Sequence, residues 1–111
     1  MAGKYVLKKS GYQLMFNLKA GNNEIILTSG HYMTEAGARN GIKSAQTNSP
    51  LDSRYERRPA AGGQQPFCFV LKAADGETIG TSEMYTTHAA RENGIQSCKT
   101  NGPTNTIEDE T

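Results

Sequence analysis

The sequence predicts an α+β fold in which two copies of one unit share a single sheet. Three observations predict it: an internal repeat spans most of the chain, apolar residues alternate at every second position in each copy, and the apolar period then changes to that of a helix. At 111 residues the chain has the size of one average domain. We therefore expect a single pseudo-twofold domain over residues 1–111, with repeat one at about 4–53 and repeat two at about 54–111.

The repeat becomes visible when the chain is shifted by 53 residues. Phe16–Pro50 then aligns with Phe69–Pro103, and 18 of the 35 positions are identical. The shared motifs are FxLKA, ExIxTS, YxTxA and NGIxSxxTNxP. A unit of roughly 50 residues buries too little surface to be stable alone, so we expect the two copies to share one core. Most of the identity would then reflect shared packing and shared turns.

Each copy begins with three predicted strands. Leu14, Phe16 and Leu18 occupy alternate positions, which is typical of a half-buried strand. Asp75-Gly76 predicts a two-residue hairpin turn with positive φ at both residues, and Asn22-Asn23 takes its place in copy one. The expected strands are 4–9, 13–20 and 24–29 in copy one, and 54–58, 67–73 and 77–82 in copy two, where residues 59–66 form a longer loop.

Each copy continues with a predicted helix. Thr34 and Thr87 stand at the N-cap position, and Pro50 and Pro103 follow the expected helix ends. Small and apolar residues share one stripe of each helix, which lets the helix approach the sheet closely. The stripes comprise Gly37, Ala38, Gly41, Ile42 and Ala45 in copy one, and Ala90, Arg91, Gly94, Ile95 and Cys98 in copy two.

An extended segment follows each helix, at 52–58 and at 104–110, and the first of these also opens copy two. The whole is expected to form one antiparallel sheet of about six to eight strands with two helices on one face. The residues expected in the core between sheet and helices are Phe16, Leu18, Ile26, Ile42, Phe69, Leu71, Ile79 and Ile95.

The tandem FxLKA, ExIxTS, YxT and NGIxSxxxN motifs resemble those of the YegP-like family, a group of small bacterial proteins of unknown function. The resemblance covers nearly the whole chain, and tandem duplication is characteristic of that family. It implies a β3-α-β unit, with two units joined in one sheet and their terminal strands exchanged. It brings no established activity, catalytic residue or cofactor, so it leaves function open.

The composition argues against several functional classes. Twelve basic and 11 acidic residues give a net charge of +1, which removes the general electrostatic argument for a nucleic-acid binder. No apolar run is long enough for a membrane span and no leader precedes the repeat, so we expect a cytoplasmic protein without a membrane partner. Cys98 lies on a helix stripe and Cys68 on the opposite sheet face, so we expect free thiols rather than a disulfide.

No set of residues predicts catalysis. His31 and His88 do not recur between the copies, and the sequence holds no nucleophile elbow, P-loop or metal-ligand spacing. Glu24 and Glu77 each follow a turn, where a strand-end role is favoured over general acid-base catalysis. We therefore expect no catalytic residue, no cofactor and no metal site.

The candidate binding residues are mostly basic. They comprise Lys8, Lys9, Arg57, Arg58, Lys19 and Lys72 on the strands, with Tyr32 and Tyr85 before the helices. Pseudo-twofold packing is expected to gather the basic strands, and such a patch suits nucleic acid or another polyanion. The favoured alternative is a solvated sheet face that is partly neutralised by Glu56 and the acidic C-terminal residues.

Two further repeated residue types have two interpretations each. Tyr32 and Tyr85 are expected to pack at strand-to-helix corners, with ligand contact as the alternative. Asn40 and Asn93 lie off the apolar stripes, so they are expected to bond to a neighbouring loop, with a binding role as the alternative.

The preferred function is a non-enzymatic binding or assembly module, because catalytic sets are absent and helices cover only one face of the sheet. The alternatives are a polyanion or nucleic-acid binder that uses the basic opening strands, and an enzyme with its site at the junction of the repeats. A protein partner or a second copy is expected to contact outward residues at Met15, Ile25 and Leu27. The acidic segment 107–110 is expected to pair antiparallel with the basic strand 4–9.

Overall fold

A computed structural model describes residues 3–58 and 67–111, so the loop expected at 59–66 lies outside the described residues. Copy one contributes β1 (Lys4–Ser10), β2 (Gln13–Lys19), β3 (Ile25–Ser29) and α1 (Glu35–Asn48). The rest of the chain contributes the 3-10 helix η1 (Asp52–Arg54), β4 (Tyr55–Arg58), β5 (Cys68–Lys72), β6 (Thr78–Thr81), α2 (His88–Asn101) and β7 (Ile107–Asp109). The α+β class and the two copies are confirmed, but the segment expected to extend from 52 begins with η1.

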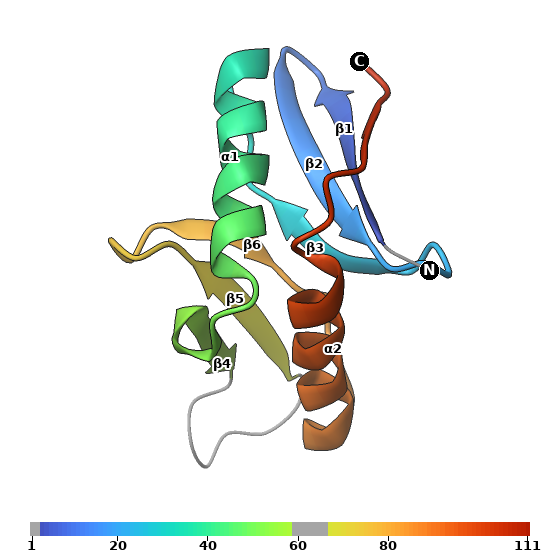
Figure 1. Ribbon diagram of the computed structural model, residues 1–111, viewed down its shortest axis with the longest axis vertical. Helices are drawn as coiled ribbons and strands as arrows, with labels where there is room; N and C mark the ends of the chain where they lie inside the picture. The colour runs from blue at the N-terminus through green and yellow to red at the C-terminus, as the bar shows by residue number, and fades with distance from the viewer. Residues whose placement is uncertain (1–2, 59–66) are drawn as a thin grey trace.

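The strands of the described residues form one mixed sheet in the order β4-β5-β6-β3-β2-β1-β7. The two copies meet where β3 pairs with β6 in antiparallel register, Thr28 opposite Thr81 and Ser29 opposite Gly80. Both helices lie on the same face of this sheet, α1 above and α2 below in the view of Figure 1. The predicted N-caps are confirmed, since Thr34 and Thr87 each accept a backbone hydrogen bond of 3.0 Å.

The terminal strands are exchanged between the copies. β7 follows α2 of copy two and pairs with β1 of copy one, while the chain after α1 crosses to form β4 beside β5. The Lys4 ammonium lies 2.9 Å from the Glu108 carboxylate, so the expected charge pairing is present. The expected antiparallel direction of this pair is wrong. α2 ends at the centre of the molecule, and the chain then runs outward in the direction of β1, which makes β7 parallel to β1 (Figure 1).

A β-bulge changes which face Leu27 occupies. β2 pairs with β3 at Leu18 opposite Leu27 and at Lys19 opposite Ile25, so Ile26 is an extra residue in β3. Ile26 and Leu27 therefore both belong to the core, and Leu27 is 0% exposed. The prediction of an outward apolar patch is wrong for Leu27, because strict alternation does not cross a bulge. The other two members, Met15 and Ile25, are half-buried.

The bulge recurs in copy two, between Leu71 and Lys72. In copy two the residue equivalent to Leu27 is Gly80. Gly80 lies in β6 at the junction of the copies, where it is opposite Ser29 of β3. A Cβ on Gly80 would lie 2.8 Å from Cγ of Leu27. The copies differ here because one leucine fills a space near the pseudo-twofold axis that two could not share.

The two β-hairpins that follow β2 and β5 use a longer turn than predicted. Among the turn residues only Asn23 and Gly76 have positive φ, 70° and 88°. Ala73 N–H donates to the Glu77 carbonyl at 2.8 Å, and Gly76 N–H donates to the Ala73 carbonyl at 3.0 Å. Asp75 therefore does not adopt positive φ, because the dipeptide sits one position later in the turn than a two-residue hairpin requires.

The core between sheet and helices contains all eight residues predicted for it. Cys98 belongs to this core, whereas Cys68 lies buried on the other side of β5, and both are free thiols, as expected. Burial raises the pKa of the Cys98 thiol to about 11. No helix in the described ranges is long and apolar enough to cross a membrane.

The ends of the two helices meet at the centre of the molecule and are held by tyrosines. The Tyr5 hydroxyl donates to the Gly102 carbonyl at 2.7 Å, and the Tyr55 hydroxyl donates to the Ser49 carbonyl at 2.6 Å. Each tyrosine thus binds the end of the helix that belongs to the other copy. A Cβ on Gly102 would overlap with the Ser49 side chain, so this crossing needs a glycine on one side.

Candidate functional site

The basic residues singled out by the sequence do not converge on one patch. β1 and β4 are five positions apart in the sheet order, which is roughly 24 Å at ~4.8 Å per strand. Lys8 and Lys9 therefore lie far from Arg57 and Arg58. The expectation that pseudo-twofold packing gathers these strands is wrong, because the axis passes between β3 and β6 and separates equivalent strands.

Carboxylates pair with part of this set. Arg57 lies 3.0 Å from Glu92, and Glu56 pairs with both Arg58 and Lys72. The members without an ion pair in the described part of the chain are Lys8, Lys9 and Lys19. The basic strands are thus partly neutralised, as the solvated-face interpretation expects.

The two repeated tyrosines pack at strand-to-helix corners. The Tyr32 ring stacks on Phe16 with 6.1 Å between ring centroids, and the Tyr85 ring stacks on Phe69 with 6.5 Å. Both tyrosines are half-buried. The rings of Tyr32 and Tyr85 therefore pack at the corners, as expected. This packing involves the rings and not the hydroxyl groups.

The hydroxyls of Tyr32 and Tyr85 have no hydrogen-bond partner among the residues that the structure describes, unlike those of the two fully packed tyrosines. Each hydroxyl rests against a helical glycine, and a Cβ on Gly41 or Gly94 would overlap with it. Burial, with a smaller contribution from nearby glutamates, raises the pKa of both hydroxyls. Like ordinary tyrosines they are protonated at neutral pH, and they are thus able to donate to a ligand.

Each of these hydroxyls opens into a cavity between a helix of one copy and a hairpin of the other. The Tyr85 cavity, of about 310 Å³, combines Tyr85, Asn93, Gly94 and Ser97 with Glu24 and Ile26. The Tyr32 cavity, of about 220 Å³, combines Tyr32, Asn40, Gly41 and Ser44 with Glu77 and Ile79. The two sets are related by the repeat shift of 53 residues, so the cavities are equivalent.

Sequence identity between the two copies is higher among the residues that line the cavities than across the whole repeat. Nine equivalent positions line both cavities and seven are identical, against 18 of 35 across the repeat. Asn40, Asn93, Glu24 and Glu77 are exposed, so core packing does not account for their identity.

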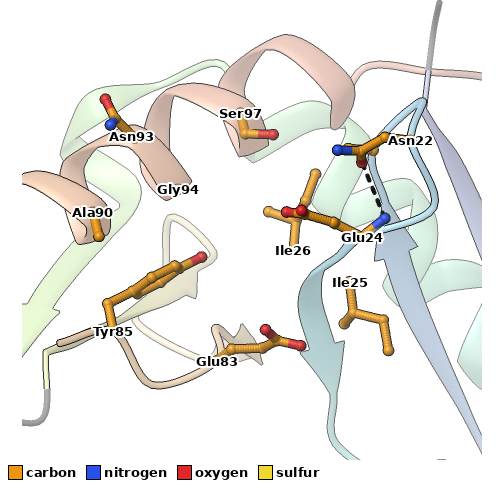
Figure 2. A pocket seen from close by; sticks show the side chains of 11 residues that line it. Asn22, Glu24, Ile25, Ile26, Glu83, Tyr85, Ala90, Asn93, Gly94 and Ser97 are labelled. Atoms are coloured by element: carbon orange, nitrogen blue, oxygen red, sulfur yellow. Dashed lines mark hydrogen bonds between the residues drawn. The ribbon is translucent and has the colours of Figure 1, made fainter.

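Several polar groups of the Tyr85 cavity face a common space, whereas the Asn93 amide points away from it (Figure 2). Figure 2 shows the Tyr85 hydroxyl, the Glu24 carboxylate and the Ser97 hydroxyl around this space, with Glu83 at another side. Ser97 Oγ accepts from Asn101 Nδ2 at 3.2 Å, which leaves its own proton available. A bound molecule would meet hydroxyl donors, a carboxylate acceptor and the apolar wall of Ile26.

The sequence pattern indicates the tyrosines but not most of their neighbours. It predicts Gly41 and Gly94 as packing residues and Glu24 and Glu77 as strand ends, and it indicates no role for Ser44 and Ser97. The signal that could have found them is identity between the copies at positions off the apolar stripe. Among residues 3–58 and 67–111, no three His, Cys, Asp or Glu side chains gather to hold a metal ion.

A family model described as a domain of unknown function, DUF1508, matches residues 10–56 and again residues 64–109. The chain belongs to the DUF1508 family. The two matches correspond to the two copies of the repeat, so the expected YegP-like resemblance is confirmed.

Relatives of this DUF1508 chain are similar over their full length. A UPF0339 protein of Bordetella pertussis is 53% identical over 111 residues, which is 100% of this chain and 98% of the relative. The YegP protein of Escherichia coli K12 is 48% identical over 112 residues and is covered completely.

Solved structures of the DUF1508 family have the same fold. The solution NMR structure of a UPF0339 protein from Shewanella oneidensis has a TM-score of 0.88 at 52% identity, covering 98% of this chain and 92% of that one. The solution NMR structure of YegP from E. coli, described as a protein of unknown function, has a TM-score of 0.90 at 48% identity, covering 100% and 95%.

Proposed function

We propose that this protein is a non-enzymatic binding module that holds small polar molecules in two equivalent cavities, one beside Tyr85 and one beside Tyr32. The observation that carries the proposal is the repeated lining of exposed and half-buried polar residues that no packing role accounts for. Each cavity uses residues of both copies, which gives the duplication a functional reason as well as a structural one.

The chemistry of the lining supports binding rather than catalysis. The tyrosine hydroxyl is protonated at neutral pH, as in any tyrosine, and burial raises its pKa further, so it acts as a donor and not as a base. The serine hydroxyl adds a neutral donor, and the glutamate adds an acceptor. Such a set suits a ligand that carries both donors and acceptors next to a short apolar body.

A polyanion site on the basic strands remains the alternative. It has less support, because β1 and β4 lie far apart and Arg57, Arg58 and Lys72 are paired with carboxylates. A gel shift with mixed nucleic acids at two salt concentrations discriminates the two functions, since a phosphate-binding surface weakens steeply as salt rises.

An NMR titration of the ¹⁵N-labelled protein with small cationic, neutral and anionic compounds tests the cavity proposal. Binding should shift the amide signals of Tyr85, Gly94 and Ser97, or those of Tyr32, Gly41 and Ser44. Tyr85→Phe should weaken binding beside it by about two- to tenfold, the value of one hydrogen bond. Tyr12→Phe is the matched control, because Tyr12 is fully exposed. Shifts confined to Lys8, Lys19 and their neighbours would favour the polyanion alternative instead.

A further inference from the structure

The two cavities differ in charge, although most of their lining is identical. Glu83 lines the Tyr85 cavity together with Glu24, so this cavity has two carboxylates. The residue equivalent to Glu83 in copy one is Gly30, and the Tyr32 cavity has Glu77 alone. The copies have therefore diverged by one negative charge at this position.

The carboxylates of the cavities are also those that the fold does not use. Of the 11 acidic residues, six form ion pairs within the described residues. The other five are Glu24, Asp75, Glu77, Glu83 and Glu110, and three of these line the cavities. No lysine, arginine or histidine lines either cavity, so a cation would have to come from a ligand.

The apolar part of the lining is shared by the two cavities. Ile26 and Tyr85 line one cavity, and Ile79 and Tyr32 line the other. The cavities thus offer similar apolar walls but differ in negative charge. An organic cation with a short apolar body suits such a lining, and the second carboxylate favours the Tyr85 cavity.

We propose that the Tyr85 cavity is specific for a small primary amine in its ammonium form, with an apolar or aromatic body, and that the Tyr32 cavity binds the same amine more weakly. The inference rests on the proposed function, because it names the ligand class of one of the two cavities. The ammonium group pairs with the Glu24 carboxylate, the Glu83 carboxylate adds a second negative charge at another side of the cavity, and the body lies against Ile26 and the ring of Tyr85.

Phenethylamine is a suitable probe, with 2-phenylethanol as its neutral analogue and phenylacetate as its anionic one. In an NMR titration at pH 7, phenethylamine should shift the amides of Tyr85 and Gly94 at concentrations about fivefold lower than those of Tyr32 and Gly41. This ratio is what one further carboxylate near an ammonium group supplies in water. The alcohol should bind both cavities equally and the acid neither.

An exchange of residues between the copies tests the charge directly. Glu83→Gly should weaken phenethylamine binding in the Tyr85 cavity about fivefold, and Glu83→Gln should do the same without a change in backbone freedom. Gly30→Glu should strengthen binding in the Tyr32 cavity by a similar factor. A side chain fits at this position because no atom lies within 4 Å of a Cβ built on Gly30. Glu35→Gln, an exposed position outside both cavities, is the control.

The outcomes separate this inference from the proposed function. If the alcohol binds the Tyr85 cavity as tightly as the amine, or if Glu83→Gln leaves the amine unaffected, the cavity binds ligands but the assignment of an ammonium is wrong. If no probe at millimolar concentration shifts an amide of either cavity, both the ammonium assignment and the proposed function are wrong.

Discussion

At the scale of single residues, the same side chain serves two purposes in this protein. Tyr5 and Tyr55 donate their hydroxyls to backbone carbonyls at the helix ends, whereas the hydroxyls of Tyr32 and Tyr85 face cavities. The sequence shows that Tyr32 and Tyr85 recur at the repeat shift of 53 residues, but it does not show which tyrosine hydroxyls find a partner in the fold. The difference lies in the hydrogen-bond partners, which depend on the crossing of the two helices.

Buried acidic groups should make the protein labile at high pH. The Cys98 thiol ionises near pH 9 when unfolded, and burial raises its pKa to about 11 in the fold. The folded state therefore holds this proton more tightly, and its contribution to stability is complete below pH 9. It should be lost between pH 9 and 11, by about 1.4 kcal/mol per pH unit. Burial raises the pKa of Tyr5 and Tyr55 as well, which adds to the loss above pH 10.

Urea unfolding at pH 8, 9.5 and 10.5 checks this dependence. Wild type should lose stability more steeply than Cys98→Ala across the series. Parallel losses in the two proteins would show that the Cys98 thiol does not titrate as its burial requires.

At the scale of elements, the bulge in β3 places the side chains of Ile25 and Leu27 on opposite faces of the sheet. Leu27 is fully buried in the core, whereas Ile25 is half-buried on the other face. Leu27→Ala should therefore cost about 2–5 kcal/mol of the free energy of unfolding. Ile25→Ala should cost about 1 kcal/mol or less. Thermal and urea unfolding of the two variants measure the difference, and equal costs would place the bulge elsewhere.

The elements themselves were predictable because their signals are local. The alternation around Phe16, the N-cap residues Thr34 and Thr87, and the prolines after each helix fix strands and helices within short windows. The face of Leu27 was not predictable, because the bulge depends on the partner strand. The parallel direction of β7 was also hidden, since it follows from where α2 ends in space.

At the scale of the whole molecule, neither copy is complete without the other. Each helix end is held by a tyrosine of the other copy, and each cavity needs a helix from one copy and a hairpin from the other. The duplication could be predicted from the repeat. The cavities could not, because their lining comes from segments roughly 30 to 75 residues apart in the sequence that only the fold brings together.

The crossing of the helix ends gives a direct test of this mutual dependence. Gly102→Ala should destabilise the protein by about 1–3 kcal/mol, because the new Cβ overlaps with the Ser49 side chain. Adding Ser49→Gly should recover part of that loss, while Ser49→Gly alone serves as the control. Urea unfolding of the three variants measures the coupling. A double variant no more stable than Gly102→Ala would show that the two residues do not meet.

The central claim is that the junction of the copies forms two ligand cavities, and crystals soaked with a mixture of small amines and alcohols test it most directly. We expect electron density for a bound compound in the Tyr85 cavity, within hydrogen-bond distance of the Tyr85 hydroxyl or the Glu24 carboxylate. An equivalent pose is expected beside Tyr32 and Glu77. Compounds bound only on the helix-free face around Lys8 and Lys19, with both cavities empty, would contradict the claim.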